Sequence, residues 1–347
     1  MGIRKDYRNN TLISHPSKAL KVLYEYHFRR NTTMTELLLN SIPLRIRALY
    51  TLIRVLPVLS WGISASLLGL GFAYASNTDI RWLDYGLILL LIVLIHGVLS
   101  HAYNDREDWL SGTDQTSPGI LSGGSRVINL GLYNLEELSW VGKSSIAAAL
   151  LVGGFLFWEV GPLILIILAI GFWSAIAYSC APLRLAYYPF AGEWLCGFPA
   201  VLTCAAGTFW VLTASIQPVI LLAGGVHALL AIGLLMHHHL SDIPSDLGSS
   251  PPKLTTVALV STSLGIKRAL LVESFYFVLA LIMGIVGTLY FHPVLWVTAP
   301  TALGCIGAAL NTDAEDIPSI TQQEYWLYFL IIGDAVVKTL LLFYCQG

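Results

Sequence analysis

Nine long apolar stretches dominate this chain and restrict it to folds that use lipid as a solvent. A helix that crosses a bilayer needs about 20 mostly apolar residues. Stretches of that kind cover residues 50–75, 82–103, 139–157, 160–179, 193–214, 218–240, 267–290, 293–310 and 325–345. Hydrophobic residues make up 56% of the chain and charged residues only 12%, about half of the roughly 25% usual in soluble domains. The sequence therefore predicts an all-α membrane protein built as a bundle of nine transmembrane helices.

Lysine and arginine residues are concentrated on one side of the predicted bundle. With the N-terminus inside, the cytoplasmic loops are 104–138, 180–192, 241–266 and 311–324. These loops and their flanks hold most of the loop bases, whereas the opposite side holds only Arg81, which is the bias typical of cytoplasmic loops. We expect residues 1–45 to form a basic cytoplasmic tail and residues 46–347 to form the transmembrane domain, in the cell inner membrane. The net charge of -2 gives no indication of a nucleic-acid partner.

Two polar segments interrupt the apolar pattern, and each directly follows a predicted transmembrane helix. The first polar segment, Asn104–Arg126, reads NDREDWLSGTDQTSPGILSGGSR. The second polar segment, Asp242–Lys253, begins with Asp-Ile-Pro-Ser-Asp and ends with a lysine. Both segments fall on the predicted cytoplasmic side. We expect them to face each other and to hold magnesium and a diphosphate together.

The spacing of the acidic residues in both segments suits a magnesium site. Asn104 and Asp108 are four residues apart, as are Asp242 and Asp246, so each pair shares one face if the helix continues through it. Oxygen ligands with open positions suit Mg2+, which is usually bound by a few carboxylates together with substrate phosphates. The bases that could neutralise phosphate oxygens are Arg54, Arg126 and Lys253. One such acidic pair could simply solvate a loop end, but two pairs on one side, each followed by a base, favour a binding site.

These residues also carry a resemblance to a known family. The pattern Asn104-Asp-x-x-Asp108 with Asp114 resembles the first acidic motif of the UbiA superfamily of intramembrane prenyltransferases, and Asp242-x-x-x-Asp246 is similar to its second. The Gly-Thr-Asp spacing and the Pro-Gly…Gly-Gly-Ser-Arg run resemble the branch that prenylates 1,4-dihydroxy-2-naphthoate in menaquinone biosynthesis. The resemblance covers about residues 50–345 and implies a nine-helix bundle of UbiA type.

The function implied by this resemblance is transfer of a polyprenyl group from an allylic polyprenyl diphosphate to an aromatic acceptor, with Mg2+ as cofactor. The implied metal ligands are Asn104, Asp105, Asp108, Asp242 and Asp246. The implied catalytic residues are Asp108, Asp114, Asp242 and Asp246. The implied diphosphate-binding residues are Arg54, Arg126, Lys253 and Tyr178. On this reading metal and bases stabilise the charge on the leaving group, and the apolar bundle shields the allylic cation from water.

Three histidines leave the identity of the acceptor open. His238 and His239 stand where the menaquinone branch usually has asparagines, and His101 stands where a polar amide is common. We take these three as candidate acceptor-pocket residues. The expected acceptor is 1,4-dihydroxy-2-naphthoate, while another aromatic acceptor and a UbiA-type terpene cyclase remain alternatives. The prenyl chain length also stays open, and candidates for a general base are Asp114, Glu193 and His101.

Ionisable residues inside the predicted helices are expected to be mainly structural. Asp334 and Lys338 are four residues apart and can pair within one helix. Successive helical residues point about 100° apart, so the histidine run 237–239 is not expected to bind one metal ion. A transporter with an acidic vestibule is the alternative from another functional class. Transporters usually place ionisable sites near the bilayer midplane, whereas the carboxylates here gather at one face, which disfavours that alternative.

Overall fold

The structure, a computed structural model, describes residues 43–344. The predicted N-terminal tail, residues 1–45, therefore lies almost entirely outside the described residues. From Ala48 onward the chain forms one compact unit, and every regular element in the described range is helical. The all-α prediction is confirmed for the part of the chain that the structure describes.

Eight helical spans between residues 43 and 344 are long and apolar enough to cross a membrane. They are Val55–Ala75 (with α3, Val55–Val58, and α4, Ser64–Ala75), Trp82–Ser111 (with α5, Trp82–Ile92, and α6, Ser100–Ser111), α8 (Leu135–Val160), Glu193–Thr213 (with α10, Phe198–Thr213), α11 (Pro218–His238), α14 (Ile266–Tyr290), Pro293–Leu310 (with α15, Thr298–Leu310) and α16 (Ile317–Tyr344). A shorter apolar helix, α9 (Ile164–Ser179), corresponds to the fourth predicted stretch. Eight of the nine predicted stretches thus correspond to helical spans long enough to cross a membrane, and the fourth corresponds only to the shorter helix α9.

Local sequence signals explain where several helices begin. Asn134 caps α8: its side-chain Oδ1 accepts hydrogen bonds from the backbone N–H groups of Glu136 and Glu137, both at 2.9 Å. The Glu137 carboxylate in turn accepts from the Asn134 N–H at 2.8 Å, so the two residues satisfy donors that the first turn would otherwise leave free. Helix α11 begins at Pro218, a residue suited to the first helical position because it lacks the N–H that a helix start cannot use.

Small residues let the helices of the bundle approach closely. A side chain at Gly69 on α4 would meet the backbone of α10 at Phe209, at 3.0 Å. A side chain at Gly233 on α11 would overlap the Phe277 ring of α14. Such contacts are the usual source of helix association in lipid, where burial of apolar surface gives no advantage. Helix α11 packs against α10, α14 and α16 and is the most buried of the spans.

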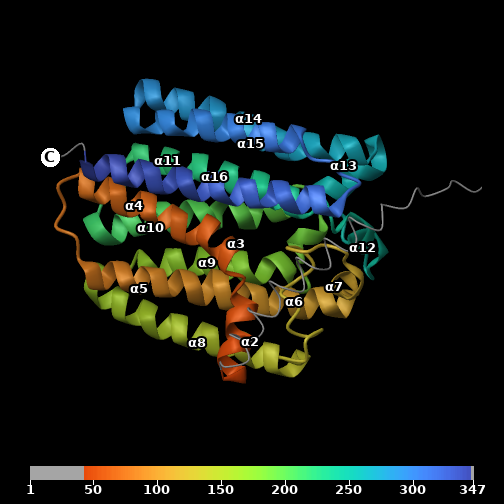
Figure 1. Cartoon of the computed structure of the whole chain (residues 1–347). Helices are drawn as coiled ribbons and strands as arrows, with labels where there is room; N and C mark the ends of the chain where they lie inside the picture. The colour runs from red at the N-terminus through yellow and green to blue at the C-terminus, as the bar shows by residue number, and fades with distance from the viewer. Residues whose placement is uncertain (1–42, 345–347) are drawn as a thin grey trace, which may run out of the picture. The chain divides into compact units, whose positions relative to one another are not determined.

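Short helices and loops at one end of the bundle position the polar segments (Figure 1). Helix α6 ends at Ser111, and the next residue, Gly112, has a φ of 92° that turns the chain into α7 (Thr113–Thr116). The second polar segment forms α12 (Ile243–Gly248), which is followed by α13 (Thr256–Leu264). Helices α7 and α12 contact each other. The two polar segments are therefore neighbours in space although more than a hundred residues separate them in sequence.

Candidate functional site

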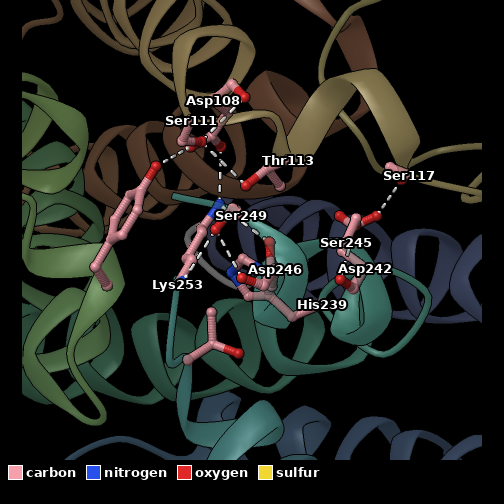
Figure 2. A network of polar contacts seen from close by, with 12 residues as sticks. Asp108, Ser111, Thr113, Ser117, His239, Asp242, Ser245, Asp246, Ser249 and Lys253 are labelled. Atoms are coloured by element: carbon pink, nitrogen blue, oxygen red, sulfur yellow. Dashed lines mark hydrogen bonds and ion pairs between the residues drawn. The ribbon is translucent and has the colours of Figure 1, made fainter. Parts of the chain in front are cut away.

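The two polar segments meet through a set of direct bonds (Figure 2). The Lys253 ammonium lies 2.8 Å from Oδ2 of Asp108 on α6. The Ser117 hydroxyl donates to the Asp242 carboxylate, and the backbone N–H of Ser250 donates to the carbonyl of Ser111 at 2.8 Å. Side chains and backbone of the first polar segment thus contact both ends of the second polar segment. The two segments face each other, as the sequence predicted.

Asn104 and Asp108 lie on a continuous helix and share one face of α6. The Asn104 amide nitrogen donates to Asp108 Oδ2 at 2.9 Å and to the Ser179 hydroxyl at 3.1 Å. The Tyr187 hydroxyl donates to the other Asp108 oxygen at 3.1 Å. Because the nitrogen makes both Asn104 bonds, the amide oxygen is the Asn104 atom that could ligate a metal ion.

The glycine-rich loop of the first segment holds two carboxylates with backbone and hydroxyl donors. The N–H of Gly123 donates to Asp242 Oδ2 at 3.2 Å, and the Ser125 N–H lies 3.2 Å from each oxygen of Asp105. Both Gly123 and Gly124 have a φ of 74°. A Cβ at Gly124 would collide with the Asp114 carboxylate, so only glycine allows the loop to pass this close to the acidic side chains.

Asp242 and Asp246 lie one turn apart, but on the separate helix α12 rather than on an extension of α11, which ends at His238. The N–H of Asp246 donates to the Asp242 carbonyl at 2.8 Å. Asp242 is held by the first segment, whereas Asp246 faces Lys253, at 3.7 Å, and His239, at 3.8 Å. Among the described residues neither buried Asp246 oxygen has a hydrogen-bond partner.

Burial and like charge dominate the electrostatics of this region. Burial, together with the neighbouring Asp108 and Asp105 carboxylates, raises the pKa of Asp114 well above its usual value. Burial likewise raises the pKa of Asp246. Burial alone would lower the pKa of Lys253, but Asp108 and Asp246 raise it well above its usual value. The aspartate side chains in this region outnumber the single buried ammonium group of Lys253, so the region favours binding of an additional cation.

A cavity opens beside these carboxylates. Most of the residues singled out in the sequence line it: Arg54, His101, Asn104, Asp108, Asp114, Tyr178, His238, His239, Asp242 and Lys253. Apolar and aromatic residues complete the wall, among them Pro57, Val58, Trp61, Ala200, Leu234 and Tyr328. The cavity wall therefore contains acidic and basic groups as well as apolar surface.

Three of the predicted site residues do not line the cavity: Asp105, Asp246 and Arg126. The Arg126 guanidinium donates to backbone carbonyls of its own loop, with the shortest bond, 2.8 Å, to Gly119. Arg126 thus holds the loop that presents the donors to Asp242, which differs from the direct phosphate contact predicted for it. Asp105 likewise holds the loop, through Ser125.

Other ionisable residues that the sequence analysis named have partners away from the cavity wall. Lys338 contacts Asp334 at 2.6 Å, one turn away on α16, as the spacing predicted. His237 contacts Glu273 on α14 at 2.7 Å. Glu193, a candidate general base, accepts a hydrogen bond from Thr256 and does not line the cavity.

Several residues that hold the site were not singled out from the sequence. Ser117 and Ser122 both donate to Asp242, the latter at 2.7 Å, and Tyr187 donates to Asp108. The serines lie within the glycine-rich run, so their position in that motif was an available signal. Tyr187 had no such signal, because its approach to Asp108 depends on how the loop after α9 folds.

Histidine, cysteine, aspartate and glutamate side chains do not form a ready-made metal cage in this structure. Within residues 43–344, no group of three or more of them is arranged to hold a metal ion. In this structure Asp108 is paired with Lys253 and Asp242 with serine hydroxyls. A metal ion at this position would therefore complete its ligand shell with other oxygen atoms, which is the usual way in which Mg2+ binds together with phosphates.

Several solved structures have a fold similar to that of this chain. A UbiA homologue from Archaeoglobus fulgidus, bound to GPP and Mg2+, superposes with a TM-score of 0.59 at 16% identity, over 84% of this chain and 99% of that one. A UbiA homologue from Aeropyrum pernix K1 gives a TM-score of 0.59 at 17% identity, over 85% and 99%. A digeranylgeranylglyceryl phosphate synthase structure gives 0.55 at 16% identity, over 86% and 99%. At these identities the similarity establishes the fold alone.

Sequence comparison establishes the family. No curated protein sequence matches the chain significantly. The UbiA prenyltransferase family, however, matches residues 59–330, a range that includes both polar segments and eight of the nine apolar helices in whole or in large part. With its apolar helical spans, this is an integral membrane protein, and the chain belongs to the UbiA prenyltransferase family.

Proposed function

We propose that this protein catalyses the magnesium-dependent transfer of a polyprenyl group from an allylic polyprenyl diphosphate to an aromatic acceptor, 1,4-dihydroxy-2-naphthoate in menaquinone biosynthesis. The observation that carries the proposal is the meeting of both acidic segments and two bases, Arg54 and Lys253, at one cavity with a partly apolar wall. Such a cavity suits a ligand with an anionic head and a hydrocarbon tail. Homologues from Archaeoglobus fulgidus have been solved with GPP or DMAPP and Mg2+, which supports this class of substrate.

The donor set of the cavity fits Mg2+. It consists of carboxylate and amide oxygens, the hard ligands that this ion takes. Asp246 is close by, and its two buried oxygens have no hydrogen-bond partner within the described residues. We infer that Asn104, Asp108 and Asp242 hold the ion, with Asp246, Asp105 and Asp114 as further ligands or as groups that orient them. When bound, Mg2+ supplies positive charge to the diphosphate as it leaves.

The other side chains that line the cavity have separate proposed roles in the reaction. Arg54 and Lys253 bind the diphosphate oxygens and stabilise the negative charge that grows as the allylic C–O bond breaks. The apolar part of the wall holds the prenyl chain and keeps water from the allylic cation. Tyr178, whose hydroxyl lies 3.2 Å from His239, borders the same space. An electron-rich ring carbon of the acceptor then attacks the cation and forms the new C–C bond, and the carboxylate of a naphthoate acceptor leaves as CO2.

The acceptor-binding residues are proposed to be His101, His238 and His239, all of which border the cavity. The naphthoate acceptor rests on the motif resemblance, in particular on the glycine-rich run that here binds Asp242. These histidines differ from the residues expected for that branch, so a different aromatic acceptor is the second candidate. The basic bias of the loops supports a site that faces the cytoplasm, in the cell inner membrane.

An acceptor screen tests the proposal. The purified protein in detergent is incubated with Mg2+, with geranylgeranyl or a longer diphosphate, and with 1,4-dihydroxy-2-naphthoate, 4-hydroxybenzoate or no acceptor. We expect prenylated, decarboxylated naphthoate by mass spectrometry and no product in EDTA. If only 4-hydroxybenzoate is prenylated, the proposed acceptor is wrong and 4-hydroxybenzoate takes its place. A cyclised hydrocarbon formed without any acceptor would indicate a terpene cyclase. No diphosphate release under any of these conditions would contradict the enzymatic proposal.

A further inference from the structure

A chain of hydrogen bonds connects helix α16 to the cavity wall through three ionisable residues. Glu324 on α16 is buried, and its Oε1 lies 2.7 Å from Nδ1 of His238, at the end of α11. The other ring nitrogen of His238, Nε2, lies 2.9 Å from Nη2 of Arg54. His238 and Arg54 line the cavity, whereas Glu324 does not. We call these residues the Glu324–His238–Arg54 chain.

The donor and acceptor roles in this chain follow from the chemistry of arginine. A guanidinium has N–H donors and no acceptor, so Nε2 of His238 must present its lone pair to Arg54. The imidazole proton then lies on Nδ1, where the Glu324 carboxylate accepts it. Glu324 therefore fixes the tautomer of His238, and this tautomer allows His238 to hold Arg54.

The charge arrangement suits anion binding. Within the Glu324–His238–Arg54 chain, the Arg54 guanidinium donates to the neutral imidazole of His238 and also to the backbone carbonyl of Leu121, the latter at 2.7 Å. Neither partner neutralises the guanidinium as a directly bound carboxylate would. Both bonds use Nη2, and within residues 43–344 no hydrogen bond from Nη1 or Nε is found, so these two groups can donate to a ligand. A negative charge one imidazole ring away, on Glu324, offsets the cost of burying the arginine.

We propose that Glu324 is a positioning residue for diphosphate binding, which acts on Arg54 through His238. The proposal rests on the function proposed above and adds a residue that does not border the cavity. Tyr328, one turn further along α16 from Glu324, does line the cavity. Helix α16 thus contributes to the diphosphate site although both acidic segments lie on other helices.

The neighbouring residue offers a matched control. His237 also contacts a buried glutamate, Glu273, through Nδ1 at 2.7 Å. Its Nε2, however, faces the carbonyl of Ile320 at 2.9 Å, an acceptor, and His237 does not border the cavity. The two pairs share residue types, and both histidines lie at the end of α11. They differ in that His238 is slightly more exposed than His237 and holds an arginine at the site.

The first test compares Glu324→Gln with Glu273→Gln. A glutamine amide can donate as well as accept, so it no longer forces the proton of His238 onto Nδ1. We expect Glu324→Gln to raise KM for geranylgeranyl diphosphate about tenfold or more, with a smaller change in kcat, and Glu273→Gln to leave KM unchanged. In a His238→Phe background, Glu324→Gln should cause no additional rise. An equal effect of both glutamine variants, or independent effects of Glu324→Gln and His238→Phe, would overturn the proposal.

The second test needs no activity and uses the unmodified protein. Nitrogen NMR of 15N-histidine-labelled protein, with the His238 signals assigned by their loss in His238→Phe, reports which ring nitrogen carries the proton. We expect a neutral ring protonated on Nδ1. A ring protonated on Nε2 would overturn the proposal even if Glu324→Gln does not fold. If the wild-type protein releases no diphosphate while this tautomer is found, the failure lies with the proposed function and not with the Glu324–His238–Arg54 chain.

Discussion

Two buried aspartate–lysine pairs in this protein have nearly the same geometry and very different settings. Asp108 and Lys253 lie 2.8 Å apart, and Asp334 and Lys338 lie 2.6 Å apart. The first pair joins two segments 145 residues apart in sequence and borders the large cavity. The second lies within one turn of α16, where Thr298 accepts a further hydrogen bond from the lysine at 2.6 Å.

The difference lies in what surrounds each pair. Around Asp108 and Lys253 there are further carboxylates, and the acidic groups exceed the bases, so the region can take up a cation and an anion together. The Asp334–Lys338 pair is formally neutral and is bonded within the bundle. Residue type alone therefore does not distinguish a ligand site from a structural pair in a membrane protein; the surrounding charge and the access to a cavity do.

The largest expected effect is on catalysis, from Asp108→Asn. This variant removes a proposed metal ligand and the partner of Lys253, so we expect magnesium-dependent diphosphate release to fall by about 10³-fold. The measurement uses geranylgeranyl diphosphate in detergent, with folding checked by thermal unfolding. Release within tenfold of the wild-type rate would contradict the role assigned to the first pair.

The second pair should affect stability instead. Asp334→Ala leaves a buried, unpaired ammonium and should reduce the free energy of unfolding by about 3–5 kcal/mol. The double variant Asp334→Leu/Lys338→Met removes both charges and should recover most of that loss. Thermal unfolding measures both, and activity per folded molecule should stay close to wild type. A variant that keeps its stability and loses activity would instead place Asp334 in the function.

The smallest effects should come from removing one hydroxyl beside each site. Ser122→Ala takes one of several donors from Asp242 and should lower activity about five- to tenfold, with little change in Tm. Thr298→Val takes the third partner from Lys338 and should cost about 1–3 kcal/mol of stability without loss of activity. Activity assays and thermal unfolding of both variants test these expectations. A stability loss without an activity loss in Ser122→Ala, together with an activity loss without a stability loss in Thr298→Val, would contradict the roles given to the two pairs.

Local patterns in the sequence were sufficient for the helical spans and for the Asp334–Lys338 pair. Each depends on residues close in sequence: about 20 apolar residues for a span, or a spacing of four for a pair on one helix. The meeting of Asp108 with Lys253 was inferable only because both segments follow helices on the same predicted side. The roles of Arg126, Glu324 and Tyr187 were not predictable, because they depend on loop folding and on helices that are distant in sequence.

Asp242 and Asp246 illustrate the same limit. Their spacing correctly implied a helical turn, but that turn belongs to α12, and only Asp242 borders the cavity. The serine and glycine donors of the first segment hold Asp242, whereas Asp246 faces Lys253 and His239. The spacing alone does not distinguish these two environments.

Calorimetric titration with magnesium pyrophosphate tests most directly whether the two polar segments form one diphosphate site. The proteins to compare are the wild type, Asp108→Asn, Asp242→Asn and the double variant, with Asp334→Asn as the control outside the site. If the segments act together, each single variant at the site should lose as much binding as the double variant, and the control should bind as the wild type does. Binding that survives unchanged in either Asp108→Asn or Asp242→Asn would contradict a shared site.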